Sequence, residues 1–206
     1  MVDRLSPHPT STRRSILRRR DFTRNSQSAT WPVLPLTALM VYSHARQNRH
    51  MVEVGYRRAR RSDIPAMAEI RAVDWGTEDY WRKRILQYLT HKLYPREALR
   101  SRISFVCIER KRIVGLIAGH LTRRFGCDGE LEWISIRPQY RGRGIASELL
   151  RHLAEWFVAH DARRVCVDVE PSNQVARRFY ARRGAENLKP HWMVWKDIRG
   201  VVEVQH

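Results

Sequence analysis

The sequence predicts a mixed β-sheet with helices on both faces, a fold of the α/β or α+β class. Three observations support this prediction for a chain of 206 residues. Beyond residue 51, strand-like segments alternate with segments of helical periodicity in the order β-α-α-β-β-β-α-β-α-β. A glycine-rich turn joins a strand to an amphipathic helix in the second half of the chain. The length suggests one domain, and the sequence shows no internal repeats.

The first part of this region predicts one strand and two helices. Residues 52–58 can form the strand, and Ser62 or Asp63 can cap a helix that has Pro65 in its first turn. A second helix is expected over residues 80–90. The apolar positions with helical spacing are Ile64, Met67, Ile70 and Val73 in the first helix and Trp81, Ile85, Leu86 and Leu89 in the second.

Three strands are expected in the middle of the chain. Residues 103–109 and 113–121 are strand-like, and Arg110-Lys111-Arg112 between them indicates a hairpin turn. Residues 126–129 indicate another turn, which leads into a strand at residues 130–137.

The last part predicts two helices and two strands in alternation. An amphipathic helix is expected over residues 145–157 and a β-branched strand over residues 165–169. A helix over residues 173–183 should end at Gly184, and residues 191–197 should form the closing strand.

The chain is strongly basic, with a formal net charge of +18 and a pI of about 11.0. Such a charge suggests an anionic partner such as nucleic acid, a membrane surface or a phosphorylated ligand. The arginines are dispersed through every predicted element, however, and an arginine-rich composition also explains the charge. We favour the compositional explanation and keep nucleic-acid binding as the alternative.

Residues 1–50 differ from the rest of the chain. They contain nine Arg and two acidic residues and show no sustained periodicity, so we expect a disordered basic extension. A start codon placed too early, with Met51 as the working start, is the favoured explanation. A basic nucleic-acid arm and an export signal near residues 11–17 are the alternatives. Residues 51–198 are the expected domain, and residues 199–206 the expected C-terminal tail.

The cysteines and the hydropathy give further expectations. Cys107, Cys127 and Cys166 are odd in number and form no CxxC pair, which favours neither a disulfide framework nor a zinc site. No apolar run approaches the roughly 20 residues needed to cross a bilayer. We therefore expect a cytoplasmic protein with no metal and no membrane partner, either a monomer or a homodimer.

The glycine-rich segment from Gln139 to Gly144 follows a strand and precedes a helix. Backbone N–H groups in such a turn can surround an anion, and the helix N-terminus adds about half a positive charge. Gly142 and Gly144 allow a phosphate to approach the backbone closely, and Arg141 and Arg143 add charge. The segment matches neither the dinucleotide fingerprint nor the P-loop. The sequence therefore indicates a phosphate-binding loop of another kind.

Two motifs together resemble those of the GNAT superfamily of acetyl-CoA-dependent N-acetyltransferases. Gln139-x-x-Gly142-x-Gly144 resembles the family's pyrophosphate loop, and Pro138 precedes it as the family prefers. Asn173-x-x-Ala176-x-x-Phe179-Tyr180-x-x-x-Gly184-Ala185 is similar to the family's second signature. The two occur in the family's order and span roughly residues 53–198. The detailed similarity is greater to spermidine/spermine-type diamine acetyltransferases than to ribosomal-protein alanine N-acetyltransferases.

This resemblance implies a mostly antiparallel sheet, acetyl-CoA as cosubstrate and transfer of the acetyl group to an amine. It places Tyr180 beside the cofactor sulfur as the general acid. It implies that a backbone N–H near Ile136 meets the developing oxyanion. The implied cofactor-binding residues are Ile134, Ile136, Gln139, Arg141, Gly142, Arg143, Gly144, Ile145, Ala146, Asn173 and Phe179. For Asn173, capping of the following helix is an alternative role.

The general base has several candidates. Glu132 matches the proposed base of the diamine acetyltransferases, and Asp168 matches the acidic position of the alanine acetyltransferases, where the family has Glu. Glu130 is the third candidate, on the same strand face as Glu132 by alternation. A water relay without a side-chain base remains open. We favour Glu132.

The first two helices wall the acceptor site in the superfamily. Here they carry a group of acids and aromatics that suits a cationic amine: Asp74, Trp75, Glu78, Asp79, Tyr80 and Trp81. Acids that complement a helix dipole are an equally good explanation. A small amine, an aminoglycoside-like compound and a protein N-terminus all remain open as acceptors.

Overall fold

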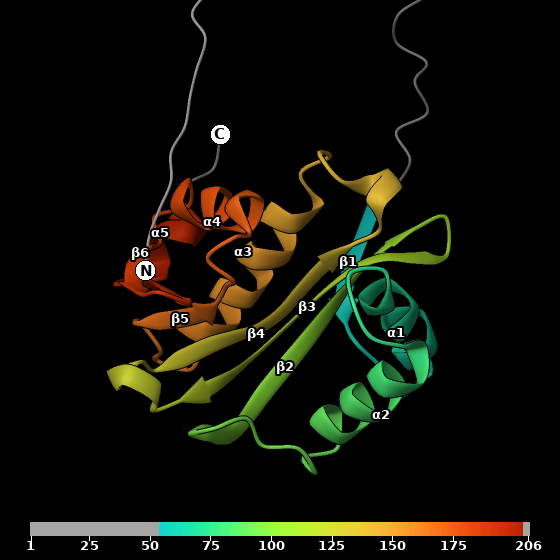
Figure 1. Cartoon of the computed structure of the whole chain (residues 1–206), viewed down its shortest axis with the longest axis horizontal. Coiled ribbons are helices and arrows are strands. Elements are labelled where there is room, and N and C mark those ends of the chain that lie inside the picture. The colour runs from blue at the N-terminus through green and yellow to red at the C-terminus, as the bar shows by residue number, and fades with distance from the viewer. Residues whose placement is uncertain (1–53, 204–206) are drawn as a thin grey trace, which may run out of the picture. The chain divides into compact units, whose positions relative to one another are not determined.

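A computed structural model describes residues 54–203 of the chain (Figure 1). The expected basic extension at residues 1–50 lies outside the described residues. The strands are β1 (Val54–Arg58), β2 (Ala98–Glu109), β3 (Arg112–Thr122), β4 (Gly129–Ile136), β5 (Val165–Asp168), β6 (Glu186–Lys189) and β7 (Trp192–Trp195). The α-helices are α1 (Ile64–Ala72), α2 (Glu78–Leu89), α3 (Ile145–Val158), α4 (Gln174–Ala181) and α5 (Arg199–Glu203).

The strands form one seven-stranded sheet in the order β1-β2-β3-β4-β5-β7-β6. Every neighbouring pair is antiparallel except β4 and β5, which are parallel. Helices α1 and α2 cover one face of the sheet, and α3 covers the other face with α5 beside it (Figure 1). The predicted fold class, with a mixed, mostly antiparallel sheet and helices on both faces, is confirmed.

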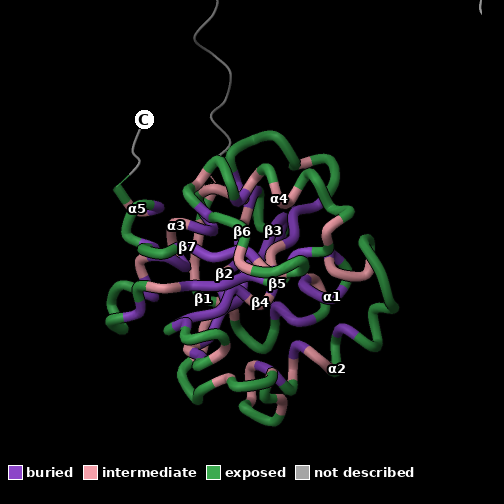
Figure 2. Tube along the Cα trace, turned by 60° about the vertical axis from the view of Figure 1, so that its left-hand side comes forward, coloured by how far each residue is buried: buried purple, intermediate pink, exposed green. Residues whose placement is uncertain are grey.

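Two apolar cores lie on opposite faces of the sheet. The first, which we call the α3 core, includes Leu149 and Leu153 of α3 and Val165 of β5. The second, the α1/α2 core, includes Met67, Trp81 and other side chains of α1 and α2. The tube in Figure 2 is buried along the central strands and exposed along the outer loops. The sheet is therefore covered on both faces, as the near-continuous burial of β3 requires.

The β2–β3 hairpin turns at Arg110 and Lys111, as predicted, although neither residue is a glycine or an asparagine. Both have positive φ angles, 48° and 65°. A two-residue hairpin turn of this kind matches the right-handed twist of its two strands. Both side chains are exposed.

Some elements differ from their predictions. Strand β6 was not predicted, because its residues are polar and mostly exposed; it pairs with β7, and its Leu188 packs against the small cluster of Cys127, Cys166 and Val194. Residues 199–203, expected in the tail, form α5, whose Val201 is buried. Asp63 occupies the N-cap position of α1, but its carboxylate accepts hydrogen bonds from Arg57 and from the Arg60 N–H instead of the helix.

Candidate active site

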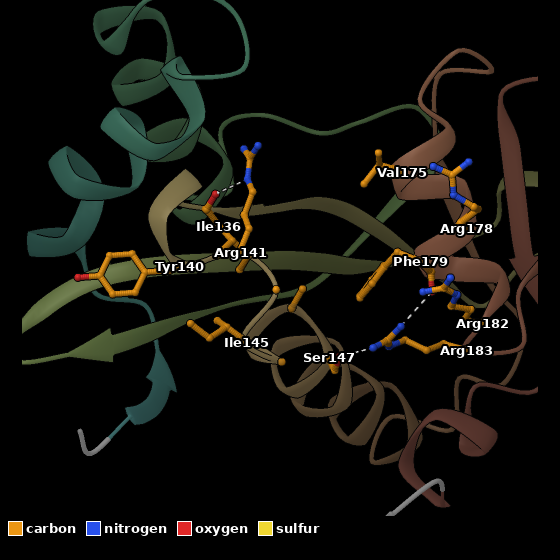
Figure 3. Close-up of a pocket in the computed structure, with 13 residues that line it drawn as sticks. Ile136, Tyr140, Arg141, Ile145, Ser147, Val175, Arg178, Phe179, Arg182 and Arg183 are labelled. Atoms are coloured by element: carbon orange, nitrogen blue, oxygen red, sulfur yellow. Dashed lines mark hydrogen bonds between the residues drawn. The ribbon is translucent and has the colours of Figure 1, made fainter. Parts of the chain in front are cut away.

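A cavity of about 500 Å³ lies between the start of α3 and the outer face of α4 (Figure 3). Its floor is formed by the end of β4 and its rim by arginines. The lining residues are Ile136, Tyr140, Arg141, Gly142, Gly144, Ile145, Ala146, Ser147, Val175, Arg178, Phe179, Arg182 and Arg183. The two sequence motifs, about 30 residues apart in the chain, therefore form the two walls of one cavity.

The glycine loop owes its shape to backbone conformation. After a 3₁₀ turn at Pro138–Tyr140, the chain passes through Gly142 and Gly144, whose φ angles are 75° and 80°. A Cβ atom added at either glycine would meet nothing within 4 Å. Glycine is required here for its left-handed backbone, and the space beside the loop stays open for a ligand. Gly144 is also the residue before the first turn of α3, so the N–H groups of that turn face the cavity.

Seven of the eleven predicted cofactor residues line the cavity, and four do not. Gln139 and Ile134 are absent from the lining. Asn173 caps α4, because its Oδ1 accepts a hydrogen bond of 3.0 Å from the Ala176 N–H. Arg143 turns away and pairs with the buried carboxylate of Glu109 at the end of β2. Of the two loop arginines, only Arg141 lines the cavity, and it also pairs with Asp74.

Three arginines of the α4 region line the cavity and were not singled out from the sequence. Arg178 and Arg182 are four residues apart, which places them on one side of α4. Arg183 lies 4.1 Å over the Phe179 ring and donates hydrogen bonds to the Phe179 carbonyl and to the Ser147 hydroxyl of α3. The sequence signal that could have identified Arg178 and Arg182 is their spacing of four residues within the helix of the second motif. Four guanidinium groups thus surround a concave, positively charged site that suits a polyphosphate ligand.

Strands β4 and β5 separate beyond the first residues of β4. Their Cα pairing joins residues 129–131 to residues 165–167 and goes no further. Beyond this point β4 continues to Ile136, which lines the cavity. The backbone at the end of β4 is therefore not covered by β5, and its polar groups can meet a ligand.

A β-bulge occurs in β4 at Glu132. The register with β3 shifts by one residue there, so Glu132 faces no partner residue. In a regular strand Leu131 and Trp133 would share a face. Here Leu131 belongs to the α3 core and Trp133 to the α1/α2 core. The bulge thus redirects the strand at the residue that the sequence favours as the base.

Glu132 and Glu130 belong to one buried polar cluster. Glu130 lies 3.0 Å from the Arg124 Nε and 3.6 Å from the Nε2 of His120, and Glu132 lies 3.5 Å from Arg84. One ligand atom from each of His120, Glu130 and Glu132 lies within 4.8 Å of the others, a set that offers metal ligands. Arginines already neutralise both carboxylates, so the cluster is balanced in charge by the protein itself. Burial, the dominant influence, raises the pKa of Glu132 above its usual value.

Asp168 lies at the end of β5 and is exposed. Partial loss of solvent around its carboxylate raises its pKa, and the nearby His191 opposes this rise. Glu130 and Arg124 act on Asp168 electrostatically, so Asp168 lies near the same cluster as the other two candidate bases. The structure therefore gathers all three candidate bases around the separation of β4 and β5.

Tyr180 is buried in the last turn of α4. Its ring packs edge-on against Phe179 and Trp195, with ring centroids 5.3 Å and 5.6 Å away. Burial raises its pKa above the usual value of a phenol, and the positive charge of Arg71 opposes this rise. The hydroxyl therefore stays protonated well above neutral pH, as a proton donor must.

The predicted acceptor residues divide into aromatic and charged groups. Trp75, Tyr80 and Trp81 form a cluster with ring centroids 4.9–5.4 Å apart, of which Trp75 and Tyr80 are exposed. Asp74 pairs with Arg141 of the glycine loop at 3.1 Å, whereas Glu78 pairs with Arg82 along its own helix. The loop between α1 and α2 is thus joined to the cavity by an ion pair.

Comparison with known proteins agrees with this geometry. The family model of the Acetyltransferase (GNAT) family matches residues 64–185, more than half of the chain. The chain belongs to the GNAT acetyltransferase family. None of the helices in the described part of the chain is long and apolar enough to cross a membrane.

Several solved structures share the fold. PaiA N-acetyltransferase from Thermoplasma acidophilum, in complex with coenzyme A, matches with a TM-score of 0.54 at 12% identity, covering 70% of this chain and 99% of that chain. An aminoglycoside N-acetyltransferase in complex with CoA matches with a TM-score of 0.57 at 19% identity, covering 66% of this chain and 90% of that chain. A GNAT family acetyltransferase from Brucella melitensis, in complex with acetyl-CoA, matches with a TM-score of 0.50 at 18% identity, covering 69% of this chain and 87% of that chain. At these identities the likeness shows the fold.

Proposed function

We propose that this protein transfers an acetyl group from acetyl-CoA to a primary amine. The observation that carries the proposal is the cavity formed by the two motifs, with its left-handed glycine loop, helix N-terminus and four arginines. Such a site matches the pyrophosphate of acetyl-CoA in charge and shape. The structural neighbours that bind CoA or acetyl-CoA support the same ligand.

The thioester end of the ligand would lie beside the uncovered end of β4. A backbone N–H near Ile136 would there donate to the carbonyl oxygen as negative charge develops. The amine attacks the thioester carbon, the carbon–sulfur bond breaks, and the thiolate leaves. In this proposal the amine proton passes to Glu132, directly or through water, and Tyr180 gives its proton to the thiolate.

The proposal is tested by ligand-dependent melting and by thiol release. Acetyl-CoA at 100 times its dissociation constant should stabilise the folded protein by about 2.7 kcal/mol through mass action. A panel of polyamines, aminoglycosides, amino acids and short peptides should then reveal acceptors through release of CoA thiol. Stabilisation by a DNA duplex at two salt concentrations, without any by acetyl-CoA, would instead favour the nucleic-acid alternative.

The base assignment predicts a pH-dependent defect. An alkylammonium with a pKa near 10.4 is only about one part in a thousand free base at pH 7, so a base is most needed at low pH. Glu132→Gln should therefore lower kcat/KM by about 10²-fold near neutral pH, with the defect fading toward pH 10. Because the pKa of Glu132 is raised, wild-type kcat/KM should fall with decreasing pH before the usual glutamate range is reached.

Asp168→Asn and Glu130→Gln are the matched comparisons for this prediction. The exposed Asp168 and the Arg124-paired Glu130 should each show a smaller defect without this pH dependence. If the pH-dependent defect appears in Asp168→Asn and not in Glu132→Gln, the base lies on β5. If no variant shows it, the proton leaves through water alone.

A further inference from the structure

Arg71, in the last turns of α1, is a cation without a carboxylate partner among residues 54–203. Its guanidinium carbon lies 4.2 Å from the Trp81 ring centroid and 6.0 Å from that of Trp133. Nη1 donates a hydrogen bond of 2.9 Å to the Ser135 hydroxyl of β4. Its Nε is enclosed and has no hydrogen-bond partner within the described residues.

Four arginines around α1 and α2 are each paired with a carboxylate. Arg57 pairs with Asp63 at 2.6 Å, Arg137 with Glu69 at 2.6 Å and Arg84 with Glu132 at 3.5 Å; Arg141 pairs with Asp74 at 3.1 Å. Arg71 and Arg102 differ from these four, because no ion pair within residues 54–203 includes them; Arg102 donates instead to the backbone carbonyls of Tyr88 and Leu93. Burial is the largest influence on the pKa of Arg71 and lowers it, and the carboxylates of Asp74 and Glu132, which pair with other arginines, oppose this shift. A desolvated charge of this kind is costly unless something neutralises it.

Arg71 lies near the residues that we propose as the base and the acid of the reaction. Both Glu132 and Tyr180 act on it electrostatically, so it lies near the favoured base and the favoured acid. The phosphates of acetyl-CoA would lie on the glycine loop, and its thioester end carries no formal charge. The acceptor is therefore the ligand that can bring an anion to Arg71.

We propose that the acceptor carries a carboxylate as well as the reacting amine, as an amino acid does, and that Arg71 binds this carboxylate. The Nη2 of Arg71 donates to no group within the described residues and is not enclosed as Nε is, so it can donate a charge-assisted hydrogen bond to a carboxylate. The stacking on Trp81 and the bond to Ser135 hold the guanidinium in place without using Nη2. Glu132 would meet the amine of the same molecule. This inference rests on the proposed function and names the acceptor class of that site.

The test compares matched acceptors that differ only in the carboxylate. Lysine and lysinamide, and ornithine and putrescine, are assayed by thiol release with the full chain and acetyl-CoA. The carboxylate member of each pair should have the higher kcat/KM. In Arg71→Gln this preference should fall by about 10- to 100-fold, the size of a charge-assisted hydrogen bond. Arg71→Lys should keep part of the preference, because it keeps the charge and loses the planar guanidinium that stacks on Trp81.

Arg82→Gln is the control, since Arg82 is exposed on α2 and pairs with Glu78. It should leave the preference unchanged. Melting of each variant with and without CoA separates this test from a loss of fold or of cofactor binding. The proposal is overturned if acetyl transfer shows no preference for the carboxylate, or if the preference survives in Arg71→Gln. If Arg71→Gln lowers kcat/KM equally for both members of each pair, Arg71 stabilises charge that develops during acetyl transfer. This result would also overturn the proposal.

Binding provides a second measurement that needs no turnover. The CoA-bound protein is titrated with the same pairs while tryptophan fluorescence is recorded, because Arg71 lies directly over Trp81. Tighter binding of the carboxylate member, lost in Arg71→Gln, supports the proposal even where no pair is acetylated. Equal binding of both members contradicts it. Failure of the proposed function itself has a different signature, namely that acetyl-CoA neither binds nor releases thiol.

Discussion

Replacing Gly142 and Gly144 together by valine should abolish stabilisation by acetyl-CoA while the domain stays folded. Both glycines have left-handed backbone, with φ angles of 75° and 80°. A β-branched residue rarely adopts such angles, so the loop must change its course. The N–H groups that would hold the pyrophosphate would then point elsewhere. Because both positions are exposed, the cores of the domain are not disturbed.

The measurement is the melting temperature with and without acetyl-CoA. Gly55→Val is the matched control, since a Cβ at Gly55 also meets nothing within 4 Å but the residue lies in the extended strand β1. This control should respond to acetyl-CoA as the wild type does. A double variant that still responds fully would show that the loop does not hold the cofactor.

Tyr180→Phe should lower kcat by about 10²-fold, the usual contribution of a general acid. The substitution removes only the hydroxyl, so the edge-on packing against Phe179 and Trp195 is retained. The affinity for CoA should therefore change little. Because burial raises the pKa of Tyr180, its ionisation should not reduce wild-type kcat as the pH rises to 10.

Tyr94→Phe is the control for this variant, because Tyr94 is exposed and lies outside the cavity lining. Pre-steady-state measurement of acetyl transfer separates the chemical step from product release. An unchanged kcat would remove Tyr180 from the reaction. A fall in CoA affinity that accounts for the whole loss would make it a binding residue instead.

Strong local patterns predicted most of the fold. Helix α3 has apolar residues on one face along its length, and β5 is a run of β-branched and small apolar residues, so both were predictable. Strand β6 and helix α5 were not, because β6 has a polar sequence and α5 has only five residues. Elements of this kind depend on neighbours such as β7 and α3 for their stability.

The sequence by itself determined the glycine loop, the second motif and the order of the elements other than β6 and α5, because each depends on spacing along the chain. Only the tertiary structure decided which side chains share a site. It turned Arg143 toward Glu109 and brought Arg178, Arg182 and Arg183 to the cavity. The bulge at Glu132 and the placement of Arg71, which has no carboxylate partner within residues 54–203, likewise depend on contacts between strands and helices far apart in the sequence. Local periodicity describes one element at a time, whereas the charge balance of a buried site depends on every element that packs around it.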